Sequence, residues 1–200
     1  MKISFFRKLD KFLDVFINSN GYTQVLTGLK NTVIIAVLGL VIGIVIGTLI
    51  ATVRVVPKYK TLPRVLNGIC SVYVSFFRGT PMVAQLLLFY YVMLPLIGVN
   101  MSGVKVSVIV FGLNSGAYIS EIMRSGIQSV DGGQMEAGRA VGLSFATTMM
   151  KIVIPQAVKN ILPALGNEFV VMVKETSLAS VFFVGELMTS YKTVQSTTFL

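Results

Sequence analysis

The chain has 200 residues, of which 54% are hydrophobic and 12% are charged, and its formal net charge is +9. The apolar residues fall in long runs, which excludes an ordinary soluble domain and indicates an integral membrane protein. There is no histidine and one cysteine, Cys70, so an internal disulfide, histidine base catalysis and histidine metal sites are excluded. No GxxxxGK[ST] loop is present, so this chain does not itself cradle ATP phosphates.

The first twenty residues carry phenylalanine, leucine and isoleucine at helical spacing, and the lysines and arginines occupy other positions. This pattern predicts an amphipathic helix that lies in the membrane interface over residues 1–21. A signal peptide is the rival interpretation, but the segment lacks a continuous apolar core. We expect a single transmembrane domain over residues 22–200.

The run Val33 to Val53 is nearly free of charge and about 30 Å long as a helix, enough to cross a bilayer. Gly39, Gly43 and Gly47 recur every four residues and predict a smooth stripe for close helix packing. Basic residues that follow this span place its far end in the cytoplasm and the N-terminus outside. The basic residues of the first segment oppose this topology.

Residues 64–94 are too long for one simple crossing, and Arg78-Gly79-Thr80-Pro81 lies near their middle. Thr80 is expected to cap, and Pro81 to begin, a half-helix inside the membrane. Its N-terminus would form a positive pole, to which Arg78 adds a full charge. An arginine inside the membrane is a functional candidate. The alternative is that Arg78 pairs structurally with Glu168 or Glu121, or reaches a membrane interface.

The third predicted span, Val104 to Met123, has its polar residues Ser107, Asn114, Tyr118 and Glu121 on one helical stripe. Such a stripe should face the interior of a bundle or an aqueous path. Asn114 is either a ligand residue or the donor of an interhelical hydrogen bond. Glu121 and Arg124, three residues apart near the cytoplasmic end, favour a surface pair.

A hydrophilic break over residues 125–155 separates the third span from the fourth. Its order predicts a short helix to Val141, a turn at Gly142 and a second helix, with Pro155 starting a new one. The fourth span is predicted over Pro155 to Val173. It carries Asn167 and Glu168. A carboxylate inside the membrane needs a cationic partner, and for Glu168 this is either Arg78 or a substrate ammonium or guanidinium.

The break also carries a motif. Glu136-Ala137, then Gly142, then Ile152-x-Ile154-Pro155 resembles the EAA loop of ABC-importer permease subunits, with matching spacing. Gly138 replaces the third alanine of the motif, and Ile154 replaces a leucine. The resemblance implies that the loop docks on a separate ATPase subunit through the following residues: Glu136, Ala137, Gly138, Gly142, Leu143 and Ser144.

Three further stretches resemble the polar amino acid branch of this family: Phe-Phe-Arg-Gly-Thr-Pro with Gln85 and Tyr90, Asn114 to Ile122, and Lys174 to Leu178. The resemblance implies an all-α, type I ABC-importer-like bundle with four spans visible and a fifth expected beyond residue 200. It implies a non-catalytic subunit for amino acid import in a bacterial inner membrane. Residues expected along the substrate path are Arg78, Thr80, Gln85, Asn114, Tyr118, Asn167 and Glu168.

The same resemblance implies the partners. These are an ABC ATPase that carries ATP and magnesium, a second permease subunit, identical or related, an external substrate-binding protein and the lipid bilayer. No cofactor, metal or nucleic acid is expected on this chain. An ion-coupled secondary transporter or a channel subunit is the alternative function, and neither requires the hydrophilic loop. Which amino acid is carried stays open.

Overall fold

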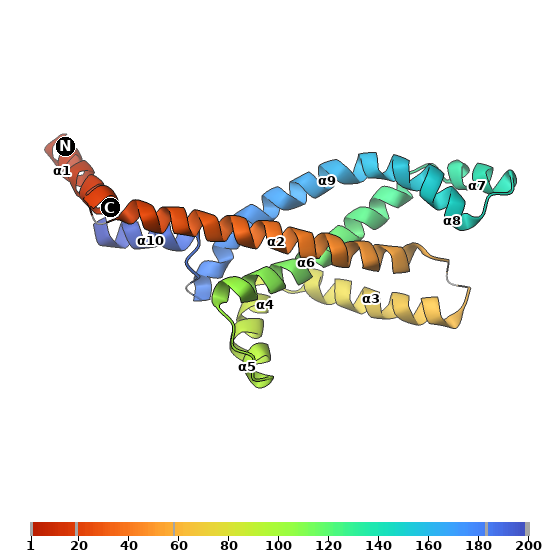
Figure 1. Cartoon of the computed structure of the whole chain (residues 1–200), viewed down its shortest axis with the longest axis horizontal. Helices are drawn as coiled ribbons and strands as arrows, with labels where there is room; N and C mark the ends of the chain where they lie inside the picture. Colours follow the sequence, from red (N-terminus) through yellow and green to blue (C-terminus); the bar gives the residue numbers. More distant parts are fainter. Residues whose placement is uncertain (1, 19, 58, 183, 199–200) are drawn as a thin grey trace.

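The computed structural model describes residues 2–18, 20–57, 59–182 and 184–198, with side chains described from residue 6 to residue 196 within those ranges. Every regular element in these ranges is helical (Figure 1). The elements are, in chain order, α1 (Lys2–Leu13), η1 (Asp14–Asn18), α2 (Gly21–Val55), α3 (Thr61–Gly79), α4 (Met82–Leu88), η2 (Phe89–Met93), α5 (Leu94–Leu96), α6 (Gly103–Gln128), α7 (Gly132–Ala140), α8 (Phe145–Thr148), η3 (Met149–Val153), α9 (Ile154–Glu175), η4 (Thr176–Phe182) and α10 (Leu187–Thr198).

Helix α2 runs through most of the length of the molecule (Figure 1). Its 35 residues make a rod of about 52 Å. It begins well before the predicted Val33, because residues 21–32 contain no proline that would end a helix. Helices α1 and α10 lie at one end of α2, and α7 and α8 lie toward the other (Figure 1).

The close contact between α2 and α6 depends on glycine on both helices. A Cβ atom on Gly43 would lie 2.6 Å from Ser115 Oγ, and one on Gly47 would lie 2.7 Å from Ile119 Cγ2, both on α6. A Cβ on Gly39 would lie 2.8 Å from the terminal methyl group of Met172 on α9. Conversely, the side chain of Ile42 on α2 packs against Gly112 of α6, where a Cβ atom would lie 2.6 Å from Ile42 Cγ2. The predicted stripe therefore lies against α6 and α9, where any larger residue collides.

The chain bends sharply between α3 and α4. The two helical segments Thr61–Gly79 and Met82–Leu96 meet at 106°, so the predicted interruption is present. The expected cap is wrong in detail: Thr80 ends α3, and its hydroxyl donates to Phe76 O at 2.8 Å. Pro81 precedes α4 in an extended conformation, with φ −63° and ψ 136°. The proline ring disfavours helical geometry in the residue before it, so α3 cannot continue through Thr80.

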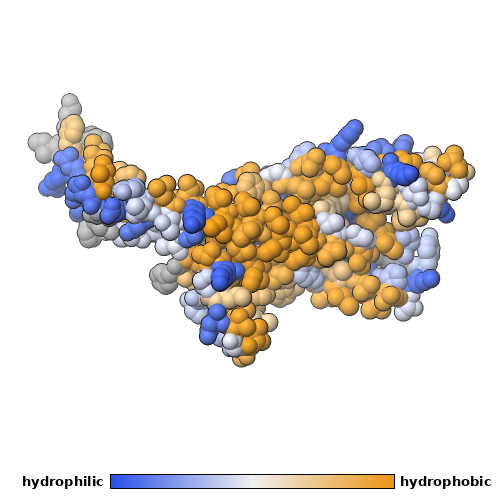
Figure 2. Space-filling model, viewed as in Figure 1, coloured by the Kyte–Doolittle hydropathy of each residue, from blue (hydrophilic) through white to orange (hydrophobic). Residues whose placement is uncertain are grey.

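Two helices, α2 and α6, are long and apolar enough to cross a membrane among the described residues, and the bent pair makes a third candidate. Helix α9 covers the fourth predicted span with 22 residues but is not in that group. Its polar residues, such as Lys159, Asn160 and Glu168, lower its hydropathy. Apolar residues cover the middle of the visible face, and hydrophilic residues gather toward both ends (Figure 2).

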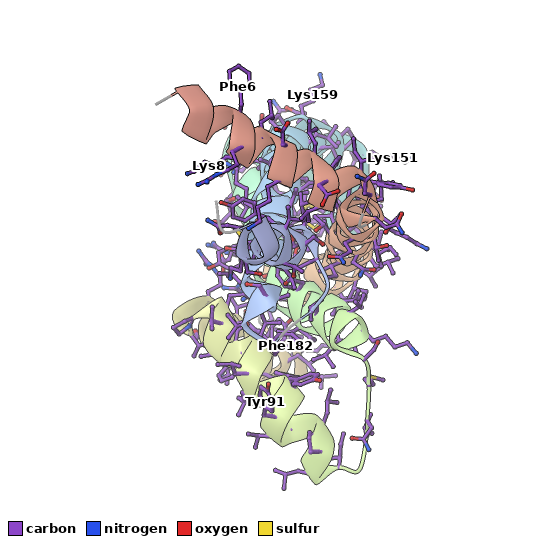
Figure 3. All side chains as sticks on the ribbon, turned by 90° about the vertical axis from the view of Figure 1, so that its left-hand side faces the viewer. Phe6, Lys8, Tyr91, Lys151, Lys159 and Phe182 are labelled. Carbon is purple, nitrogen blue, oxygen red and sulfur yellow. The ribbon has the colours of Figure 1, made fainter. Side chains whose placement is uncertain are left out.

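The predicted interfacial segment over residues 1–21 includes residues 1 and 19, which lie outside the described residues. Residues 2–18 are helical as α1 and η1, Asn20 is not helical, and Gly21 begins α2. Phe6, Leu9, Leu13 and Ile17 are exposed. Phe6 and Lys8 point in different directions from the helix, and Phe6 points away from the molecule (Figure 3). This is the two-faced arrangement that an interfacial helix has.

Residues 187–198 form α10, which packs along the N-terminal part of α2. Ser190 Oγ of α10 donates to Gln24 O at 3.0 Å, and Asn31 Nδ2 of α2 donates to Gly185 O, just before α10, at 2.6 Å. Glu186 is buried and caps α10, since its carboxylate accepts from the backbone N–H groups of Met188 and Thr189, both at 2.7 Å. A carboxylate at a helix N-terminus satisfies otherwise unpaired donors.

Candidate functional site

Helices α7 and α8 form a compact projection, which we call the knob and define as residues 131–148. Both helices are capped by their own sequence. Asp131 Oδ1 accepts from Gly133 N at 2.8 Å, and Ser144 Oγ accepts from Thr147 N at 3.1 Å. Each cap satisfies a backbone donor that the first turn leaves unpaired. The knob is therefore a formed structure rather than a loose loop.

The turn between the two helices depends on Gly142. Its φ is +90°, so the predicted glycine turn is present. Leu143 N donates to Gly138 O at 3.1 Å, and Gly142 N donates to Arg139 O at 3.0 Å. The Arg139 guanidinium adds a bond to Leu143 O at 2.9 Å. The two backbone bonds satisfy carbonyls at the end of α7 in the manner of a glycine C-cap, and the Arg139 bond ties the residue after the turn to the helix.

Pro155 lies in the first turn of α9, which begins at Ile154, as predicted, but α9 is not separated from the helix before it. The helical backbone is continuous from Phe145 to Glu175 through α8, η3 and α9. The wider π-helical turn Met149–Val153 ends two residues before Pro155. Proline lacks the N–H that an α-helix needs, and a widened turn allows the helix to pass through it. The knob is thereby joined rigidly to α9.

The six predicted coupling residues fall into two groups. Glu136, Ala137, Gly142 and Ser144 are exposed, whereas Gly138 is buried against Thr148 and Leu143 is half-buried. Sequence reasoning missed Val141, whose exposed fraction is 77% at the end of α7. A valine directly before the turn glycine, in an otherwise hydrophilic loop, was the available signal. An exposed apolar side chain beside polar neighbours is typical of a contact surface.

A second cluster of predicted residues lies at the bend between α3 and α4. Gln85 Nε2 donates to Phe77 O at 2.9 Å and to Thr80 Oγ1 at 2.7 Å. Asn114 Nδ2, from α6, donates to Phe77 O at 3.1 Å and to Gln85 Oε1 at 2.9 Å. Asn114 and Gln85 are both buried. These amides satisfy the carbonyls that the interrupted helix leaves free.

Toward the C-terminal end of α6, three arginines lie close to the Glu121 carboxylate. Arg54 from α2 binds Glu121 Oε1, and Arg124 binds Oε2 through Nε at 2.9 Å and Nη2 at 2.7 Å. Arg78 from α3 lies farther away, with Nη1 at 4.0 Å from Oε1. The predicted Glu121–Arg124 pair is present, but it belongs to a cluster that joins three helices.

The sequence left Glu121 and Glu168 open as structural partners of Arg78. In the structure Arg78 faces Glu121 and not Glu168. Its guanidinium lies over the Tyr118 ring, 5.2 Å from the ring centroid. Tyr118 and Asn167 are exposed and Glu168 is half-buried on α9. Within the described residues, no lysine or arginine forms an ion pair with Glu168. In the same part of the chain, no group of three Cys, Asp or Glu side chains is placed to hold a metal.

Comparison with known proteins gives one family. Residues 43–199 match the family model described as "Binding-protein-dependent transport system inner membrane component". The chain is 42% identical over 125 residues to the putative glutamine transport system permease protein GlnP of Rickettsia bellii, covering 62% of this chain and 57% of the relative. It is 44% identical over 124 residues to the L-cystine transport system permease protein TcyB of Bacillus subtilis, covering 62% and 53%. The matched stretch thus spans little more than half the length of these relatives.

Two solved structures have the same fold. A crystal structure of an amino acid ABC transporter with histidines superposes with a TM-score of 0.82 and 39% identity, covering 92% of this chain and 84% of that one. An inward-facing structure of the MetNI methionine ABC transporter has a TM-score of 0.72 at 17% identity, over 89% and 87%, and supports the fold alone. The predicted ABC-importer permease fold is confirmed. The chain belongs to the family of binding-protein-dependent transport system inner membrane components.

Proposed function

We propose that the chain is the transmembrane subunit of an ATP-driven importer for amino acids. It forms part of the translocation path and couples that path to a separate ATPase. The observation that carries this proposal is the knob, which is capped, joined rigidly to α9 and tipped by the exposed Val141. Relatives named as glutamine, L-cystine and arginine permeases support amino acids as the cargo class.

The knob docks on the ATPase, and that partner holds ATP and Mg²⁺, while this chain holds no cofactor. Val141 supplies the apolar contact, and Glu136 and Ala137 lie exposed on the preceding helix, α7. An apolar anchor with polar surroundings is the usual composition of a specific interface. Gly138, Gly142, Leu143 and Ser144 shape the knob.

The knob then lies in the cytoplasm of a bacterial cell with the chain in the inner membrane. We place the N-terminus outside, and the position of α1 at the end of α2 away from the knob supports this proposal (Figure 1). The interfacial helix over residues 1–21 lies on the outer surface, and residues 22–200 form the permease domain. A second permease subunit, identical or related, completes the path, and an external binding protein delivers cargo.

The residues predicted along the path have two roles. One role is structural. The bend between α3 and α4 is held by hydrogen bonds that Thr80, Gln85 and Asn114 make to the backbone and to one another. Arg78, Tyr118, Asn167 and Glu168 retain exposed surface or lack a charged partner, so they face the cargo. ATP-driven closure of the partner pulls the two knobs together and exchanges inward-facing and outward-facing states.

The test is purification of the tagged protein from its native host in mild detergent, followed by identification of the chains recovered with it. We expect an ATPase in stoichiometric amount from the wild type. We expect Val141→Glu to lose at least about 90% of it, since a buried charge in an apolar contact costs several kcal/mol. Glu136→Ala should keep the ATPase bound but uncouple hydrolysis from uptake.

Leu96→Glu provides the matched control, because Leu96 at the end of α5 has the same exposed fraction, 77%, as Val141. This variant should recover as much ATPase as the wild type. A wild-type protein that purifies alone, yet transports in liposomes without ATP, would contradict the importer proposal and favour an ion-coupled transporter.

A further inference from the structure

The arginine cluster on α2, α3 and α6 carries more positive charge than it neutralises. One carboxylate, Glu121, faces the guanidinium groups of Arg54, Arg78 and Arg124. Only 17% of the Glu121 side chain is exposed, and the residue lies seven positions, or about 10 Å, before α6 ends. Excess charge at a partly buried position inside a helical membrane bundle is costly unless an anion compensates it.

Two of the three arginines donate hydrogen bonds to Glu121. Arg124 holds Glu121 Oε2 in a two-point contact and also donates to Gln128 Oε1 at 2.7 Å. Arg54 occupies the other carboxylate oxygen. Arg78 differs, because its 4.0 Å approach to Glu121 is beyond hydrogen-bond range. In the described part of the chain, Arg78 donates no hydrogen bond.

Arg78 is nevertheless held in place and accessible. Its guanidinium rests over the Tyr118 ring at 5.2 Å, a contact that stabilises a cation without using its N–H groups. The Arg78 side chain is 43% exposed, and Tyr118 is exposed on the polar stripe of α6. One face of the guanidinium is therefore fixed, while its five donors remain available to a ligand.

We propose that Arg78, supported by Tyr118, receives the carboxylate of the amino-acid cargo; this inference rests on the proposed function. A guanidinium presents a planar fork that matches a carboxylate in a two-point contact, which a lysine cannot reproduce. Glu121 competes with the cargo carboxylate for Arg78, because it lies 4.0 Å from the guanidinium. This competition limits how tightly Arg78 holds the cargo and favours its release. The site selects molecules with a free carboxylate over the corresponding amines.

The test measures binding to the purified complex, in phosphatidylcholine nanodiscs and without ATP. The probes are radiolabelled L-arginine with agmatine, L-histidine with histamine, and L-cystine with cystamine, each pair differing by the carboxylate. For the pair whose amino acid binds, Arg78→Gln should raise the Kd of the amino acid by about 10- to 100-fold. The Kd of the amine should change by less than about threefold, because no contact is lost.

Arg64→Gln is the control, since Arg64 is an exposed basic residue on the same helix, and both Kd values should match the wild type. Arg78→Lys should fall between the wild type and Arg78→Gln. Equal weakening of amine and amino acid, no weakening of either, or a wild type that binds no amino acid would overturn the proposal.

A lipid phosphate could also supply the anion, and a second set of nanodiscs with phosphatidylglycerol distinguishes this source. Loss of phosphatidylglycerol retention in Arg78→Gln, with the amino-acid Kd unchanged, assigns the arginine to lipid and contradicts the proposal. If the predicted Kd pattern is found but ATP drives no uptake, the carboxylate assignment stands and the importer proposal fails.

Discussion

The side-chain amides of Asn114 and Gln85 are joined by a hydrogen bond of 2.9 Å, and both donate to the same backbone carbonyl, that of Phe77. The carbonyl belongs to the last part of α3, the amides come from α4 and α6, and both side chains are buried. The bend between α3 and α4 is thus tied to α6 by a polar network inside the bundle.

We expect Asn114→Leu to destabilise the protein by about 1–3 kcal/mol, because the Gln85 side-chain oxygen loses its amide donor and Phe77 O keeps only one. The measurement is the melting temperature of the purified protein in detergent. Asn167→Leu is the control, since Asn167 is exposed on α9, and its melting temperature should stay close to that of the wild type. Equal melting temperatures for the two variants would show that the network does not hold the bend.

Two glycine variants on different helices should affect stability differently. Gly43→Ala places a methyl group 2.6 Å from Ser115 Oγ and 3.2 Å from Gly116 N, so α2 and α6 must separate. Gly68→Ala meets no atom within 4 Å and gains helix propensity of about 1 kcal/mol. Thermal unfolding in detergent should give a lower melting temperature for Gly43→Ala and an equal or higher one for Gly68→Ala. A stabilised Gly43→Ala would contradict the close packing.

The knob contains a pair of positions that should be coupled. A Cβ on Gly138 collides with the buried side chain of Thr148, including its Cγ2 methyl group. We expect Gly138→Ala to lower stability and Thr148→Ser, which removes that methyl, to relieve part of the loss. A double-mutant cycle should give a coupling energy of about 1 kcal/mol. Additive effects would mean that Thr148 moves aside without cost.

Gly142 and Gly132 offer a comparison that isolates backbone strain. Neither glycine has an atom within 4 Å of its missing Cβ, but only Gly142 has a positive φ, +90°. Gly142→Ala should therefore cost about 1–2 kcal/mol, and Gly132→Ala should cost nothing or stabilise α7 slightly. Limited proteolysis of the knob reports the difference directly, with faster cleavage expected in Gly142→Ala alone. Equal protection of both variants would be inconsistent with a strained turn.

Features that depend on neighbouring residues in the chain were predictable. The apolar runs, the interruption at Gly79–Pro81 and the turn at Gly142 all follow from local chemistry: a proline or glycine acts on the backbone within a few residues. The exact cap at Thr80 and the continuity through Pro155 were not predictable. In both cases several local conformations are allowed. The folded chain selects one of them, with Gln85 of α4 bonded to Thr80 and a π-helical turn preceding Pro155.

By itself, the sequence determined that this is a helical membrane protein with its small residues on one stripe of α2 and its hydrophilic knob after α6. Those properties arise from composition and periodicity along single helices. Only the tertiary structure decided that Arg78 faces Glu121 and not Glu168, that Asn114 and Gln85 hold the bend, and that Val141 is exposed. Such pairings depend on how each helix is rotated and shifted against the others, and this is set by the packing of the whole bundle.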